Sequence, residues 1–332
     1  MKKQFTNIII VKGAAKFTLA LLLTTLLSGF AVAKEPLLII RRDGKIFEEA
    51  KDGIQSELSG HFIITDFITT DAVTTDDISE IMSVAKPKIV VLMDNNSIRM
   101  YKEYMAALPP SEPRIPSLSM MGVLIDKAIQ GMDASVGISY EVPIVTSAVN
   151  LRAALKINIR NIAVVHREFM SEFIERNEAF CKREGIGIIS YPINDRARNF
   201  ESELKKALRA ISQEEAIDVI WIPNDNALVN ASTITNVWIP FQRKSKTAVI
   251  VGVSALVNPD LNFGTFAVLP DNISLGAQAA EFILEIMDND WDVDAGFTQP
   301  PISVYQAINY RQSKELFNVE KSSLGEIDQI LE

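Results

Sequence analysis

Short apolar runs alternate with segments whose apolar residues recur at helical spacing along most of the chain. The run Leu37–Arg41 precedes a helical pattern over residues 46–58, and Lys88–Met93 precedes one that extends to Leu108. The alternation restarts near Gly137, and a short amphipathic helix is expected in the tail from Ser322. Roughly ten such strands are too many for one sheet, so we expect two doubly wound α/β domains with parallel sheets, joined by a hinge.

The first 33 residues differ from the rest of the chain. They carry four lysines and no acidic residue, an apolar core over residues 17–27, and the small-x-small pattern Ala31–Ala33. The apolar stretch from Phe17 to Val32 has 16 residues, fewer than the roughly 20 that span a bilayer. We therefore expect a signal peptide cleaved after Ala33 rather than an anchor. No cysteine lies near this site to carry a lipid, and a periplasmic protein follows if the host has two membranes.

The negative net charge of the chain argues against some classes of binding partner. The chain of 332 residues has a formal net charge of −9, and loss of the four leader lysines makes it −13. Such a chain is repelled by nucleic acid and by anionic membrane surfaces. Cys181 is the single cysteine and follows Phe173, Ile174 and Asn177 at helical spacing, so it is expected in the core.

The stretch from Ile217 to Ala231 places polar residues directly after a buried strand. The apolar run Val219–Ile222 ends at Pro223, and Asn224, Asp225 and Asn226 follow. The carboxyl edge of an open α/β sheet is where small ligands bind. Asp225 or Asn226 could instead only cap a helix that starts immediately afterwards.

Other apolar strands also end in polar residues. Together these strand ends would line a polar binding site between two facing sheets, where a carboxylate takes a ligand ammonium group and helix N-terminal amides take a carboxylate. Each one alone is most often a helix cap. The candidate ligand-binding residues are Asn95, Asn96, Ser97, Tyr140, Asn224, Asp225, Asn226, Ser254 and Asp271.

Signatures of enzymes are missing from the motifs of the chain. Its two histidines, His61 and His166, lie in no motif that would activate a serine, and we expect packing or capping for His166. Two histidines and one cysteine do not suffice for a zinc site. Gly185 and Gly187 are not followed by the third glycine of a dinucleotide fingerprint, and no Walker lysine loop occurs. We expect no catalytic residue, no metal and no cofactor.

Three stretches carry a family resemblance: Asp218–Asn226, which reads D-V-I-W-I-P-N-D-N, Asn272–Gln278 and Ala307–Leu316. On these residues the chain resembles the periplasmic substrate-binding proteins of ABC transporters with the type I fold. More closely, it is similar to the branch that includes tryptophan- and tyrosine-binding members, where the first stretch commonly reads D-A-I-Y-V-P-T-D-N. The resemblance covers nearly the whole chain after the leader.

The resemblance implies where the chain crosses between domains, namely near Tyr140, Ser254 and Asp290. Residues 34–140 plus 255–291 would form the first domain and residues 141–254 plus 292–332 the second. Two departures border the family's binding site. Ser119–Gly122 stands where the family often has Ser-Asp-Pro, and Leu269–Asp271 stands where it often has a tyrosine pair.

The resemblance also implies a function. It predicts a monomeric solute receptor that closes its domains by a hinge motion on a small, amino-acid-like ligand and delivers it to an inner-membrane ABC permease. Asp225 would take the ammonium group, and Asn96, Ser97, Asn226 and Ser254 would hydrogen-bond the rest. The alternative is an exported sensor that presents its bound state to a membrane kinase or cyclase, and a remote alternative is an enzyme.

Overall fold

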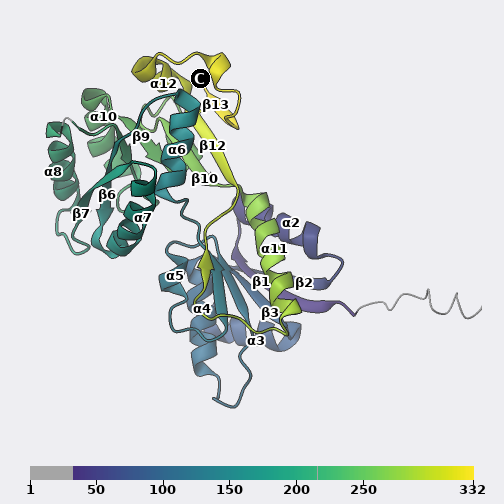
Figure 1. Ribbon diagram of the computed structural model, residues 1–332. Helices are drawn as coiled ribbons and strands as arrows, with labels where there is room; N and C mark the ends of the chain where they lie inside the picture. Colours follow the sequence, from purple (N-terminus) through teal and green to yellow (C-terminus); the bar gives the residue numbers. More distant parts are fainter. Residues whose placement is uncertain (1–32, 215) are drawn as a thin grey trace, which may run out of the picture.

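The computed structural model describes residues 33–214 and 216–332, which form two sheets with helices on both faces (Figure 1). The expected signal peptide lies almost entirely outside the described residues. Within these residues, no helix is both long enough and apolar enough to cross a membrane.

Domain I is built on a six-stranded sheet in the order β11-β5-β4-β3-β1-β2, with every strand pair parallel. Helices α2 and α11 cover one face, and α3, α4 and α5 cover the other. Its elements are β1 (Glu35–Arg42), α2 (Lys45–Leu58), β2 (Phe62–Thr69), α3 (Thr75–Ala85), β3 (Ile89–Met93), α4 (Asn95–Ala107), β4 (Ser117–Met120), α5 (Ile125–Ala128), β5 (Ser135–Ile138), α11 (Asn272–Asp288) and β11 (Thr298–Gln299).

Domain II is built on a seven-stranded sheet in the order β13-β12-β10-β9-β8-β6-β7, in which β10 and β12 alone run antiparallel. Its elements are α6 (Ile144–Leu155), β6 (Asn161–Arg167), η1 (Glu168–Met170), α7 (Ser171–Arg183), β7 (Gly187–Ile193), α8 (Phe200–Gln213), β8 (Val219–Trp221), α9 (Ala231–Thr233), η2 (Ile234–Trp238), α10 (Ile239–Ser245), β9 (Ala248–Val251), η3 (Ser254–Val257), β10 (Phe266–Pro270), β12 (Val304–Asn309), α12 (Tyr310–Phe317), η4 (Lys321–Ser323) and β13 (Gln329–Leu331).

The central strands are the apolar runs seen in the sequence. All five residues of β3 and all four of β9 are buried, as expected for parallel strands covered on both faces. Cys181 and Trp221 are buried in the core of domain II, as the sequence predicted. The two-domain α/β architecture expected from the alternation of strands and helices is confirmed.

Two of the predicted domain boundaries are wrong. Strand β10 pairs with β9 in domain II, and β11 pairs with β5 in domain I. Residues 255–270 therefore belong to domain II and residues 292–299 to domain I, because Phe266 and Val268 pack into the core of domain II. The first crossing lies between β5 and α6, and the second and third lie at residues 270–272 and 300–303.

Two local expectations also fail. The tail forms the short helix η4 and strand β13 instead of an amphipathic helix, because Gln329–Leu331 pair with the edge of β12. The chain after Asn226 does not enter a helix at once. Asp225 accepts a hydrogen bond from the amide of Ala227 within a turn, and the helix begins only at Ala231, where Asn230 is the cap.

Helix α11 returns from domain II to pack on α2, and the contact depends on two glycines. A Cβ atom at Gly276 would lie 2.0 Å from the carbonyl oxygen of Ala50, and one at Gly53 would lie 2.1 Å from that of Ile273. The two helix backbones therefore approach more closely than any larger residue allows. This contact attaches α11 to domain I, although the strand before it, β10, lies in domain II.

Candidate functional site

The carboxyl ends of the parallel strands in both domains lie next to the crossings between the domains. The chain leaves domain I after β5, leaves domain II after β10, and re-enters domain II at the start of β12, which pairs with the end of β10. The loops after β1, β3, β6, β8 and β9 lie at these same edges, because those strands are parallel to β5 or β10. This arrangement brings the predicted polar strand ends to the region between the two domains.

At the edge of domain II, Asp225 is buried and binds a guanidinium group. Its two carboxylate oxygens accept hydrogen bonds of 2.6 and 2.9 Å from Nε and Nη2 of Arg167, at the end of β6. The Asp225 side chain is 1% exposed and that of Arg167 is 28% exposed. The guanidinium also lies over the ring of Phe169, 4.5 Å from its centroid. Arg167 is thus the accessible member of a fixed ion pair.

The neighbours of Asp225 are less buried. The amide group of Asn224 donates a 3.4 Å hydrogen bond to the carbonyl of Gly252, which connects the ends of β8 and β9. Asn226 is exposed, and its backbone carbonyl accepts a hydrogen bond from Asn230. Both residues lie at the predicted edge, and within the described residues the guanidinium of Arg167 forms its hydrogen bonds with Asp225.

The edge of domain I carries a second ion pair of the same kind. Nε of Arg42, at the end of β1, lies 3.1 Å from Oδ2 of Asp94, which caps α4 through its other oxygen. The geometry of this pair falls short of a hydrogen bond, so Oδ2 is a buried oxygen without a hydrogen-bond partner among the described residues. Arg41 points the other way and is fully buried against Asp66 and Glu48. Of these two arginines, Arg42 is therefore the accessible one.

The three predicted residues after Asp94 have different surroundings. The amide group of Asn95 exchanges two hydrogen bonds, of 2.7 and 2.8 Å, with the backbone of Val123. The side-chain oxygen of Asn96 accepts a hydrogen bond from Arg99. The hydroxyl of Ser97 is buried and has no hydrogen-bond partner among the described residues. Asn95 is exposed but its amide group is bound to the Val123 loop, whereas Asn96 is half-buried and its amide nitrogen makes no hydrogen bond among the described residues.

A pocket of about 430 Å³ opens between the two domains. Domain I contributes Lys45, Ile46 and Glu49 of α2 and the start of α11, and domain II contributes Ser254, the end of β10, Tyr305 and Gln329. Two predicted residues, Ser254 and Asp271, lie in this lining. The volume is suited to a ligand of amino-acid size, at the small end of the usual range for ligand sites.

Two residues of the pocket lining, Asn272 and Glu49, belong to a hydrogen-bonded group that also includes Tyr140. Asn272 donates a 2.9 Å hydrogen bond to Glu49 and accepts one of 3.5 Å from the hydroxyl of Tyr140. Burial raises the pKa of Tyr140, and the nearby Glu49 carboxylate adds to this effect. Tyr140 therefore stays protonated and acts as a donor near the pocket. Asp271 caps α11 through a 2.7 Å bond from the amide of Ser274.

The basic residues at the site were not among those predicted from the sequence. Arg42 and Arg167 each end the first strand of a domain, and Lys45 and Glu49 follow one turn apart on α2. The available signal was a polar or charged residue at the end of an apolar strand, the criterion that identified Asp225. The same criterion applied to arginines places Arg42 and Arg167 at this edge, where they pair with Asp94 and Asp225.

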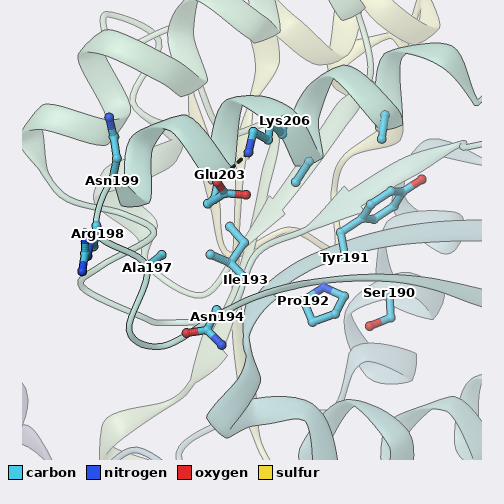
Figure 2. A pocket seen from close by; sticks show the side chains of 12 residues that line it. Ser190, Tyr191, Pro192, Ile193, Asn194, Ala197, Arg198, Asn199, Glu203 and Lys206 are labelled. Carbon is cyan, nitrogen blue, oxygen red and sulfur yellow. Dashed lines mark hydrogen bonds and ion pairs between the residues drawn. The ribbon is translucent and has the colours of Figure 1, made fainter.

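A second pocket, of about 720 Å³, lies between β7 and α8 in domain II (Figure 2). Its lining includes Tyr191, Ile193, Asn194 and the ion pair between Glu203 and Lys206. It contains none of the predicted ligand-binding residues, and a single domain forms it. It is therefore a groove on the outer surface rather than the place where the predicted residues meet.

The remaining chemistry-bearing residues are structural. His166 is buried, and its Nδ1 donates to the carbonyl of Arg167 while its Nε2 accepts from Ser190, at 2.8 Å each. Burial lowers the pKa of His166, so the ring is neutral and fully hydrogen-bonded. Among residues 33–214 and 216–332, no group of three or more His, Cys, Asp or Glu could hold a metal ion.

Solved structures share this architecture. The ABC domain from Streptococcus pneumonia in complex with L-Trp is 17% identical, with a TM-score of 0.52 over 89% of this chain and 100% of that one. A ligand-free, open substrate-binding protein with adhesive properties from Clostridium difficile is 14% identical, with a TM-score of 0.63 over 90% and 99% of the two chains. A periplasmic ribose ABC transporter structure from Conexibacter woesei is 13% identical, with a TM-score of 0.50 over 90% and 99%.

The chain has the type I periplasmic-binding-protein fold. The fold expected from the resemblance is confirmed. The tryptophan- and tyrosine-binding branch stays a prediction, because these identities are too low to carry ligand or branch. No family model and no curated protein matches the sequence.

Proposed function

We propose that this protein is an exported solute receptor that closes its two domains on a small zwitterionic, amino-acid-like ligand. The observation that carries the proposal is the interdomain pocket of about 430 Å³, lined by charged and apolar residues of both domains. A ligand that touches both walls of such a pocket stabilises the closed arrangement by its additional contacts.

The charges at the pocket and its neighbouring strand ends suit a zwitterion. Lys45 and the accessible guanidinium groups of Arg42 and Arg167 would meet a carboxylate, and Glu49 and Asp271 an ammonium group. Lys45 and Glu49 lie 3.4 Å apart, so the ligand would replace this exposed pair. The apolar part of the ligand would lie on Ile46 and Ile273, which are 44% and 57% exposed. In this arrangement Asp225 acts through Arg167, whose guanidinium it holds in place.

Thermal shift against a panel of amino acids, sugars and carboxylic acids tests the ligand class. Mass spectrometry of the denatured protein identifies any ligand retained through purification. We expect an amino acid to raise the Tm, and Glu49→Gln and Arg167→Gln to weaken its binding at least tenfold. Lys206→Gln, in the outer groove, is the matched control. Binding of a sugar alone, or unchanged affinity in both site variants, would contradict the proposal.

Delivery to an inner-membrane ABC permease completes the proposed role, and export would follow cleavage after Ala33. Deletion of the gene should then abolish uptake of the identified ligand, and the mature protein should begin at Lys34 in mass spectra. A sensor role is the second candidate. It is favoured by similarity to a structure of a XylFII–LytSN complex, with a TM-score of 0.53, in which such a fold is assembled with a second protein. Normal uptake with a lost transcriptional response would favour this candidate.

A further inference from the structure

The segment from Met121 to Lys127 of domain I reaches across to domain II. Leu124 is 4% exposed and packs in the hydrophobic core of domain II, next to Val142 and Phe173. Met121 and Leu124 both have positive φ, of 58° and 49°. Such backbone conformations are costly for residues with side chains and persist where surrounding contacts over-determine them.

Two charged residues that follow Leu124 connect the same two domains. Asp126 pairs with Arg176 of α7 at 2.6 Å, and Lys127 donates a 2.9 Å hydrogen bond to the carbonyl of Phe169. Lys127 also lies 3.3 Å from Glu172. In Figure 1, α5 lies on the side of domain I that faces α7.

The segment is also tied to the crossing between the domains and to the start of α4. The amide of Leu124 donates a 2.8 Å hydrogen bond to Oε1 of Glu141, which is buried where the chain passes from β5 to α6. Val123 precedes Leu124, and its backbone N–H and C=O are both hydrogen-bonded to the side-chain amide group of Asn95. Asn95 is one of the residues predicted to bind ligand.

We propose that residues 121–127 form an interdomain clamp that sets the resting angle between the domains and is held at the crossing by Glu141. The clamp would regulate the domain closure of the proposed receptor, so this inference rests on the proposed function. A ligand that displaces Asn95 shifts Val123 and weakens the clamp. The clamp therefore couples the start of α4 to the hinge.

Protonation of Glu141 favours the clamped arrangement. Burial raises the pKa of Glu141 to about 7. The backbone amides of Leu124 and Glu141 and the guanidinium of Arg176 on α7 favour its ionisation, and the carboxylate of Asp126 on α5 disfavours it, but burial outweighs them. Ionisation puts an anion in this buried position, so the clamp is weaker above pH 7 than at pH 5.

Distances between spin labels on the two domains, measured without ligand, test the clamp. The labels are placed by Glu80→Cys on α3 and Arg209→Cys on α8, both exposed positions, in a Cys181→Ala background. We expect a narrow distribution for the parent protein at pH 5. It should broaden in the double variant Lys127→Gln, Arg176→Gln and broaden further in Leu124→Ala, because the buried side chain contributes more than exposed ion pairs.

The controls separate the clamp from general charge effects and from the proposed function. Lys206→Gln removes an ion pair within α8 and should leave the distribution unchanged. Raising the pH from 5 to 8 should broaden the parent distribution and leave that of Glu141→Gln unaltered. Identical distributions in the parent and the double variant would overturn the clamp, even if ligand binds. If the variants loosen as expected but no compound of the thermal-shift panel binds the parent protein, the receptor role is overturned and the clamp stands.

Discussion

Glu141 shows how one buried residue makes the stability of the protein depend on pH. Its pKa is raised by burial from 4.5 to about 7. The unfolded chain therefore loses this proton at a lower pH than the folded one, and the free energy of unfolding should fall as pH rises between 4.5 and 7. The change is at most about 3 kcal/mol. Urea denaturation across this range should show the fall in the parent protein and not in Glu141→Gln. An equal pH dependence in both would show that other groups dominate.

Asp225 should matter for stability as well as for binding. Asp225→Ala leaves Arg167 without its partner and the amide of Ala227 without its acceptor. We expect a loss of about 1–3 kcal/mol, measured by urea denaturation. Glu203→Ala breaks an exposed pair with Lys206 and should cost less than about 0.5 kcal/mol. Equal losses in the two variants would show that the buried pair stabilises the protein no more than the exposed pair does.

Individual residues also show how much of the candidate site could be predicted from the sequence. Asp225 and Ser254 could be placed at the carboxyl ends of strands because an apolar run and its polar end are local patterns. The pairing of Asp225 with Arg167 joins residues on different strands. The pairing depends on β6 lying beside β8 in the sheet. The alternation of strands and helices along the chain does not specify this strand order.

At the scale of elements, the contact between α2 and α11 depends on the absence of side chains at Gly53 and Gly276. Gly276→Ala would place a methyl group 2.0 Å from the backbone carbonyl of Ala50, which cannot rotate away. We expect a net loss of about 1–3 kcal/mol despite the better helix propensity of alanine, measured as a lower Tm. Gly60→Ala, with open space around it, is the control. A Tm equal to that of the parent would show that the helices can separate at little cost.

The same scale shows which elements the sequence predicted. Central strands such as β3 and β9 are continuous apolar runs and were found. β13 was missed because its three residues gain a strand conformation only by pairing with β12. The boundary near Ser254 was wrong for a related reason. The pattern after β9 predicts a strand, but it does not predict which sheet the strand joins. Burial of Phe266 in the core of domain II places this strand in the sheet of domain II.

The whole molecule should contract when ligand binds. The interdomain pocket has walls from two domains whose chain connections are the three crossings, so closure requires only rotation about them. Small-angle scattering should show a lower radius of gyration with a saturating amino-acid ligand from the panel than without it. Glu49→Gln, which alters one wall, should need more ligand for the same contraction, whereas Lys206→Gln should match the parent. Tight binding without contraction would assign the ligand to one domain and contradict closure as the basis of the function.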